Sequence, residues 1–138
     1  MFERLRGKSQ RVERKACENL SAASTLANLE DPCPNAATTR AYYAAYQAVW
    51  SKLEENDVPV PEVRPGVEYF KHDEIGPLAQ EYQLFDRGLA VLFEDLREAR
   101  VKADYYADDC TQDEAREYVQ NAKVIVESLL GAGCCDDQ

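Results

Sequence analysis

Two arginines and an aspartate are spaced along one segment so that their side chains would lie together on a helix. Residues 96–106 read LREARVKADYY. At 100° per residue, Arg97, Arg100 and Asp104 fall on one edge of an apolar stripe, with Asp104 between the two arginines. Two guanidinium groups and a carboxylate, half-buried beside a core, form a candidate polar site. The same residues also fit an ordinary Arg100–Asp104 ion pair at i,i+4, worth only about 0.3–0.5 kcal/mol.

The second candidate is His72, the only histidine of the chain. An imidazole can move a proton near neutral pH, which few other side chains do. A lone histidine in a loop is most often a solvated side chain. The alternative is that its loop folds back over the end of the helix that carries Arg97, and brings an imidazole to the two arginines.

Four long helices are predicted to position these residues, because apolar residues recur every three or four positions in four stretches. The stretches run from about residue 3 or 9 to 27, from 35 or 36 to 55, from 77 or 84 to 107 with a break before Phe85, and from 111 to 130. Pro32 and Pro34 separate the first two, and Thr111 with Glu114 forms a capping-box pattern before the last. The pattern favours an all-α, antiparallel up-and-down four-helix bundle, with no competing strand.

One connection in this bundle is unusually long. Residues 57–75, between the second and third helices, contain Pro59, Pro61, Pro65 and Gly66 as well as His72. Connections within compact bundles are mostly short, and a loop of this length is either functional or mobile. The expected organisation is a single helical domain over residues 1–130, followed by a flexible tail over residues 131–138.

The charge of the chain is strongly acidic but unevenly distributed. The formal net charge is −10, yet the first 15 residues carry six basic side chains against two acidic ones. An acidic body opposes non-specific binding to a phosphate backbone, so nucleic acid would have to meet a local basic patch. A basic partner protein is an equally good inference. The basic run itself, Arg4 to Lys15, fits a solvated helix face or a nucleic-acid contact.

A group of aromatic residues on the second predicted helix allows two interpretations. Tyr42, Tyr43, Tyr46 and Trp50 could stack on nucleic-acid bases. However, Tyr42 and Tyr46 lie on the apolar stripe of that helix, and the other two flank it. We therefore expect core packing for the first pair and a dimer interface for the flanking rings.

Several kinds of site are excluded by composition and motif. The five cysteines include no Cys-x-x-Cys pair and lie far from His72, which disfavours structural zinc and favours reduced thiols. A Gly-rich phosphate loop, a Gly-x-Ser-x-Gly elbow and a His-Glu-x-x-His motif are absent, and one histidine cannot build a di-iron bundle. No cofactor or metal is expected. With no apolar run long enough to span a membrane and no secretion signal, the expected location is the cytoplasm.

Two segments of the chain resemble a HEPN domain, the "higher eukaryotes and prokaryotes nucleotide-binding" family. One is LREARVKADYY, which is followed by a capped helix, and the other is TTRAYYAAYQAVW at residues 38–50. The resemblance extends from about Arg11 to Leu130. It implies a helical bundle, in agreement with the periodicity. In HEPN ribonucleases an arginine is followed four to six residues later by a histidine, and two chains bring these groups together in a dimer.

This chain departs from that pattern, because no histidine follows His72. Five residues after Arg100 stands Tyr105, and seven after Arg97 stands Asp104; neither phenol nor ionised carboxylate replaces imidazole well at neutral pH. The resemblance is to a branch with an "LR…ADY" helix end that lacks the histidine and is often encoded beside a nucleotidyltransferase in toxin–antitoxin-like pairs. It implies a homodimeric module that binds a nucleotide, RNA or that partner.

Two alternatives stay open at this point. One is an atypical metal-independent ribonuclease that uses Arg97, Arg100 and either His72 or Tyr105. The other is a protein–protein adaptor with no nucleotide site.

Overall fold

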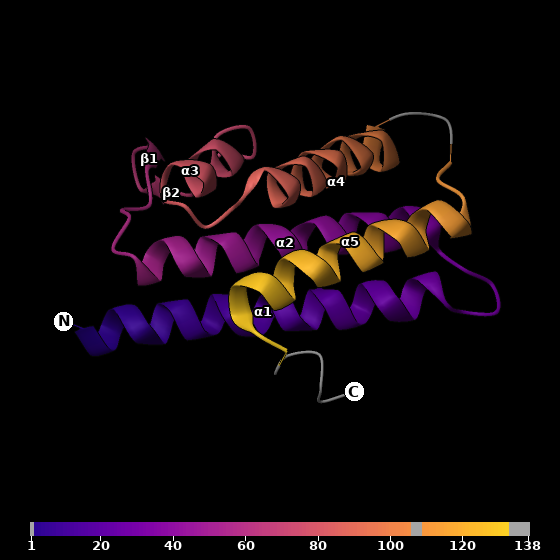
Figure 1. Ribbon diagram of the computed structural model, residues 1–138, viewed down its shortest axis with the longest axis horizontal. Helices are drawn as coiled ribbons and strands as arrows, with labels where there is room; N and C mark the ends of the chain where they lie inside the picture. The colour runs from indigo at the N-terminus through magenta and orange to yellow at the C-terminus, as the bar shows by residue number, and fades with distance from the viewer. Residues whose placement is uncertain (1, 106–108, 133–138) are drawn as a thin grey trace.

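The computed structural model describes residues 2–105 and 109–132, with side chains from residue 10 onward. Within these ranges the chain forms five helices and one small hairpin (Figure 1). The elements are α1 (Phe2–Ala27), α2 (Pro34–Glu55), β1 (Glu62–Arg64), β2 (Val67–Glu68), α3 (Ile75–Glu81), α4 (Arg87–Tyr105) and α5 (Gln112–Leu130). The predicted all-α character is confirmed, although the described part has five helices where four were expected.

Helix α2 occupies the centre of the structure, in contact with α1, α3, α4 and α5. Figure 1 shows α1 and α2 side by side, with α4 and α5 lying along α2. Alanines recur at fully buried positions of α1 and α2, and such small side chains permit a close approach of two helices. The larger fully buried side chains come from α2, α3, α4 and α5 and from the segment after β2; they include Tyr42, Leu53, Phe70, Ile75, Phe93 and Ile125.

The helix ends follow the local signals in the sequence. Helix α1 ends at Ala27 and α2 begins at Pro34, where a proline fits the first turn because its missing N–H has no helical partner there. At the start of α5, Thr111 Oγ1 accepts a hydrogen bond from the Glu114 backbone N–H at 3.1 Å. The Thr111 N–H in turn donates to Glu114 Oε1 at 3.0 Å. The predicted capping box is therefore confirmed.

The long connection contains the one element that sequence periodicity did not predict. Strands β1 and β2 pair in antiparallel fashion, with Glu62 opposite Glu68 and Arg64 opposite Val67. Gly66 in the turn has φ of +77°, a conformation that glycine adopts without steric cost. The strands are only three and two residues long, too short to show alternating hydrophobicity. The expectation of a strand-free chain is thus wrong at this hairpin.

The third predicted helix is divided into α3 and α4, with the break before Phe85 as expected. At the break, Gln83 has φ of +60° and the backbone N–H of Leu84 returns to the Ala79 carbonyl at 2.8 Å. Asp86 then opens α4, because its Oδ1 accepts the backbone N–H of Leu89 at 2.8 Å. The predicted end of this helix, at residue 107, and most of the predicted tail, including Cys134 and Cys135, lie outside the described residues.

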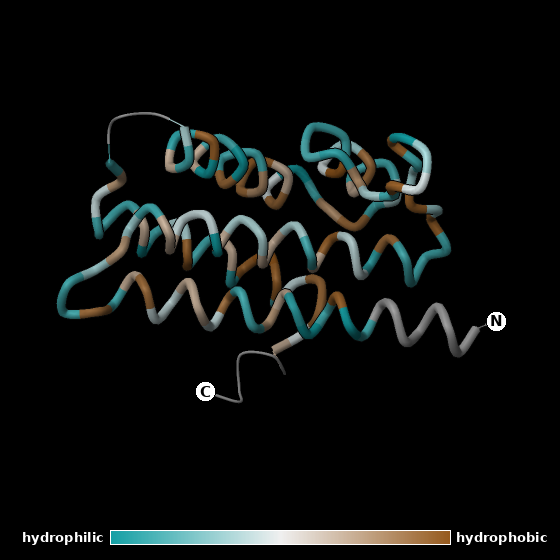
Figure 2. The backbone as a smooth tube through the Cα atoms, turned by 180° about the vertical axis from the view of Figure 1, so that it is seen from behind, coloured by the Kyte–Doolittle hydropathy of each residue, from teal (hydrophilic) through white to brown (hydrophobic). Residues whose placement is uncertain are grey.

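Hydrophobic residues are distributed along each helix in short groups separated by polar ones (Figure 2). This is the pattern of helices that bury one face and expose the other. Among the described residues, none of the helices combines the length and the apolar character needed to cross a bilayer.

Candidate functional site

The long connection after α2 is bound to the surface of α2 by aromatic residues. Phe70 is fully buried, and its ring meets that of Trp50 edge-on with centroids 5.2 Å apart. The Tyr46 hydroxyl donates to the Phe70 carbonyl oxygen at 2.5 Å. This backbone carbonyl would otherwise be buried without a partner, which is costly. The two contacts fix the chain immediately before His72.

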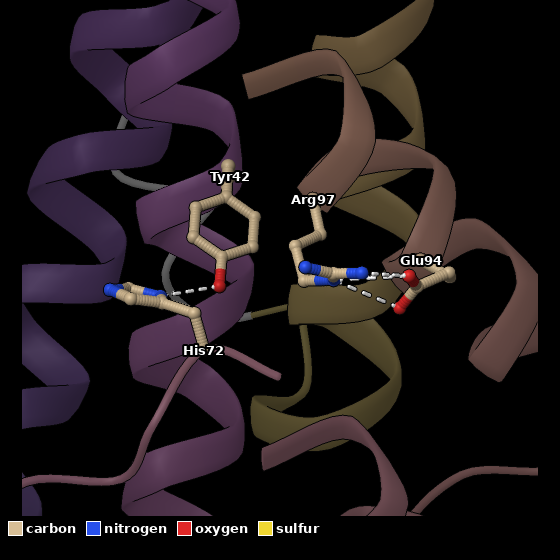
Figure 3. Close-up of polar contacts among 4 residues, drawn as sticks. All are labelled: Tyr42, His72, Glu94 and Arg97. Carbon is tan, nitrogen blue, oxygen red and sulfur yellow. Dashed lines mark hydrogen bonds and ion pairs between the residues drawn. The ribbon is translucent and has the colours of Figure 1, made fainter. Parts of the chain in front are cut away.

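His72 consequently lies against α2 rather than in solvent. The hydroxyl of Tyr42 lies 2.7 Å from Nδ1 of His72 (Figure 3). The imidazole also packs on three tyrosine rings, with centroid distances of 4.6 Å to Tyr46, 5.5 Å to Tyr42 and 5.8 Å to Tyr43. The loop therefore packs on the tyrosines of α2, and none of the hydrogen bonds or ring contacts of the described residues joins His72 to Arg97 or Arg100.

The surroundings of His72 favour its neutral form. Burial lowers its pKa from the ordinary value of 6.5, and the positive charges of Arg100 and Arg97 lower it further, against a weaker opposing effect of Asp73. An uncharged imidazole with Nδ1 at the Tyr42 hydroxyl has Nε2 as the remaining nitrogen for proton transfer. Burial also raises the pKa of Tyr42, so this phenol stays protonated.

Arg100 connects the carboxyl-terminal part of α4 to α2. Its Nη2 donates to the Tyr43 hydroxyl at 3.2 Å, and its guanidinium carbon lies 5.8 Å and 5.5 Å from the ring centroids of Tyr42 and Tyr43. Its Nε is 3.0 Å from Asp104 Oδ2. That contact is an ion pair rather than a well-directed hydrogen bond, because the buried Nε has no partner of correct geometry. Arg100 is 16% exposed and Asp104 is 28% exposed, so the predicted pair is partly buried.

Asp104 has a second partner across the helix interface. Its Oδ1 accepts a hydrogen bond from Thr39 Oγ1 on α2 at 2.7 Å. Both carboxylate oxygens are therefore engaged, one by Arg100 and one by Thr39. A carboxylate bound in this way positions its neighbours and is a poor candidate for proton transfer.

Arg97, one turn before Arg100, is held by its own helix. Its Nε lies 3.0 Å and 3.2 Å from the two carboxylate oxygens of Glu94, and its Nη2 also donates to Glu94 (Figure 3). This bonding raises the pKa of Arg97, which remains a cation. The side chains of Arg97 and Glu94 are 29% and 47% exposed. In the view of Figure 3, the Tyr42 hydroxyl lies between the His72 imidazole and the Arg97 guanidinium.

Tyr105 is the one predicted site residue that stands apart. It is 73% exposed at the last position of α4. Among the contacts of the described residues, none joins Tyr105 to Arg97, Arg100, Asp104 or His72. The structure thus brings four of the five predicted residues to the interface of α2 and α4.

A surface cavity of about 330 Å³ adjoins the buried ion pair. Its lining residues are Asn35, Ala36, Thr39, Arg40, Tyr43 and Asp104. The lining includes one cation, Arg40, one aromatic ring, Tyr43, and polar side chains, and it adjoins Asp104 near the end of α4. The cavity could admit a small polar group beside Tyr43 and Asp104.

Glu94, Thr39, Tyr42 and Tyr43 belong to the site but had not been identified from sequence as members of it. Glu94 stands three residues before Arg97, a spacing that signals an ion pair on a helix. Tyr42 and Tyr43 were interpreted as core and interface rings, and only the fold shows that their hydroxyls contact His72 and Arg100. Within the described residues, no group of His, Cys, Asp and Glu side chains is arranged to hold a metal ion.

Comparison with protein families gives a match over most of the chain. No curated protein matches this chain. The family comparison matches residues 9–132 to the HEPN domain, which covers every described helix at least in part. The helices, the arginines of α4 and the extent of this match lead to one conclusion: the chain belongs to the HEPN domain family.

Proposed function

We propose that this HEPN domain binds the phosphate groups of RNA or of a nucleotide through Arg97 and Arg100. One observation carries the proposal. The two guanidinium groups stand about one turn apart on α4, and Arg100 lies over the rings of Tyr42 and Tyr43, the first of which bonds His72. Two neighbouring guanidinium groups can bind an anion when it replaces a carboxylate partner, here Glu94 at Arg97 or Asp104 at Arg100.

The two arginines would have different parts in binding. Arg100 is held among Tyr42, Tyr43 and Asp104 and is mostly buried, so it supplies a fixed charge. Arg97 is more exposed, and its partner Glu94 is nearly half exposed. A phosphate can therefore replace Glu94 at Arg97 at small cost, since exposed ion pairs contribute at most about 1 kcal/mol.

The acidity of the chain suggests that binding depends on a partner. A net charge of −10 repels nucleic acid at a distance, so a single site would give weak, salt-sensitive affinity. We therefore extend the proposal to a homodimer, and to a nucleotidyltransferase partner in a toxin–antitoxin or defence-type pair. Both extensions come from the resemblance of the LR…ADY helix end. Co-purification of the tagged chain with its neighbouring gene product would test the second.

The binding proposal is tested by titrating a labelled single-stranded RNA, and separately ATP, into wild-type protein and Arg97→Ala. Loss of a charge-assisted phosphate contact should weaken binding by about tenfold or more. Arg87→Ala is the matched control, because Arg87 is an exposed arginine at the other end of the same helix. Equal affinity of wild type and Arg97→Ala for every probe would refute the proposal, and absence of any binding would favour the adaptor alternative.

A metal-independent ribonuclease is the second candidate, favoured by the position of His72. A neutral imidazole near two arginines has the groups needed to accept a proton and to neutralise a phosphate. Cleavage of an RNA mixture in EDTA should then disappear in both His72→Ala and Arg97→Ala and persist in Arg87→Ala. We place binding first because Nδ1 of His72 is occupied by the Tyr42 hydroxyl and the hydrogen bonds of Arg97 go to Glu94.

A further inference from the structure

A second cavity, of about 320 Å³, lies between α1 and α5, away from the arginines of α4. Helix α1 lines it with Leu20 and Ser24, and Asn28, the residue after α1, lines it too. Helix α5 lines it with Arg116, Val119, Gln120 and Lys123. Its volume is at the lower end of the range of small-molecule sites in proteins.

The charge of this cavity is opposite to that of the chain. Both of its charged lining residues, Arg116 and Lys123, are cations, and no carboxylate belongs to the lining within the described part of the chain. The whole sequence has 26 acidic residues against 16 basic ones. A cavity of this size with cations only therefore favours an anionic ligand.

Arg116 is held in place before any ligand binds. Its Nε donates to Asn28 Oδ1 at 3.1 Å, and the amide nitrogen of Asn28 donates to the Ser24 carbonyl at 2.8 Å. The first bond joins α5 to α1 and orients the guanidinium through Nε rather than through its two terminal nitrogens. A fixed guanidinium loses less side-chain freedom on binding, which favours affinity.

The second cation stands at a defined separation from the first. Arg116 and Lys123 are seven residues apart, two turns along the same face of α5, which corresponds to about 10 Å. Leu20 and Val119 supply apolar surface to the cavity between them. We propose that this cavity binds a small organic dianion, with carboxylate or phosphate groups at both ends of an apolar body. One anionic end meets Arg116 and the other meets Lys123.

The experiment is a titration of the full chain with suberate, followed by backbone amide NMR shifts and by calorimetry. Octanoate, with one charge, and octanediol, with none, are matched ligands of the same chain length. Hexamethylene diphosphonate tests phosphate-type ends. We expect shifts concentrated at residues 20–28 and 116–123, and binding of a dianion at least about tenfold tighter than that of octanoate.

Two variants test the assignment of the ends. Arg116→Gln and Lys123→Gln each remove one charge at an exposed position and should reduce dianion affinity to that of the monoanion. Lys102→Gln, an exposed lysine on α4, is the control and should bind as wild type does. The proposal is overturned if both α5 variants bind the dianions normally, if octanediol binds as well as suberate, or if the shifts fall on α4.

Discussion

The hydroxyl of Tyr42 and Nδ1 of His72 lie 2.7 Å apart, which joins the middle of the chain's central helix to a loop 30 residues away in sequence. The same tyrosine ring lies under the guanidinium of Arg100. Residues of α2, of the loop after β2 and of α4 thus meet at one side chain. The position of the chain's only histidine depends on this contact.

Removal of the Tyr42 hydroxyl should destabilise the fold without creating a cavity in the core. In Tyr42→Phe the ring keeps its packing, while the imidazole loses a hydrogen-bond partner in a partly buried place. We expect a loss of about 0.5–1.5 kcal/mol in the free energy of unfolding, measured by urea denaturation. Tyr105→Phe, at a position that is 73% exposed, should be neutral by comparison. Equal stability of Tyr42→Phe and wild type would show that the bond contributes nothing.

His72 should make stability depend on pH below about 6.5. The pKa of the folded protein's His72 is lowered from 6.5 by burial and by the arginines. As the pH falls through 6.5, the unfolded chain therefore takes up this proton first, and the free energy of unfolding decreases until the folded pKa is passed. Above about pH 6.5, His72 is neutral in both the folded and the unfolded state, so its contribution to the free energy of unfolding does not change with pH.

The measurement is the difference in unfolding free energy between wild type and His72→Gln, followed from about pH 5 to 7.5. Carboxylate titrations common to both proteins cancel in this difference. We expect the unfolding free energy of wild type, relative to that of His72→Gln, to decrease as the pH falls. A difference that stays constant would mean that His72 titrates alike in both states.

Asp104→Asn should destabilise the contact between α2 and α4. The substitution keeps an oxygen for Thr39 but removes the charge opposite Arg100, which is only 16% exposed. A buried cation without its counterion is costly, and we expect a loss of about 1–3 kcal/mol in thermal or urea unfolding. Asp95→Asn, at an exposed position on the same helix, serves as the control and should change stability little.

Thr111→Ala should weaken the start of α5 by removing the side-chain cap. The Thr111 hydroxyl accepts the Glu114 N–H, and its loss leaves that donor without its helix cap. Such substitutions typically cost about 1 kcal/mol. Thr111→Ser should restore most of the stability, because serine keeps the hydroxyl. If serine and alanine are equally unstable, the effect belongs to the threonine methyl group and not to the cap.

The sequence by itself determined the features that depend on neighbouring residues. Prolines between α1 and α2, the Thr111–Glu114 spacing and the 3.6-residue periodicity act through local backbone chemistry, so helix ends could be predicted closely. The i,i+4 pair of Arg100 and Asp104 was predictable for the same reason. The resemblance at residues 38–50 and 96–106 also identified the family that the later comparison confirmed.

Only the tertiary structure determined the contacts between side chains of different elements. The 57–75 segment carries little periodicity, and its path is set by Phe70 packing on Trp50 and by the hydroxyls of Tyr46 and Tyr42. Thr39 likewise reaches Asp104 across 65 residues. No local pattern encodes such contacts, because each is selected by burial and by hydrogen-bond satisfaction once the helices have packed.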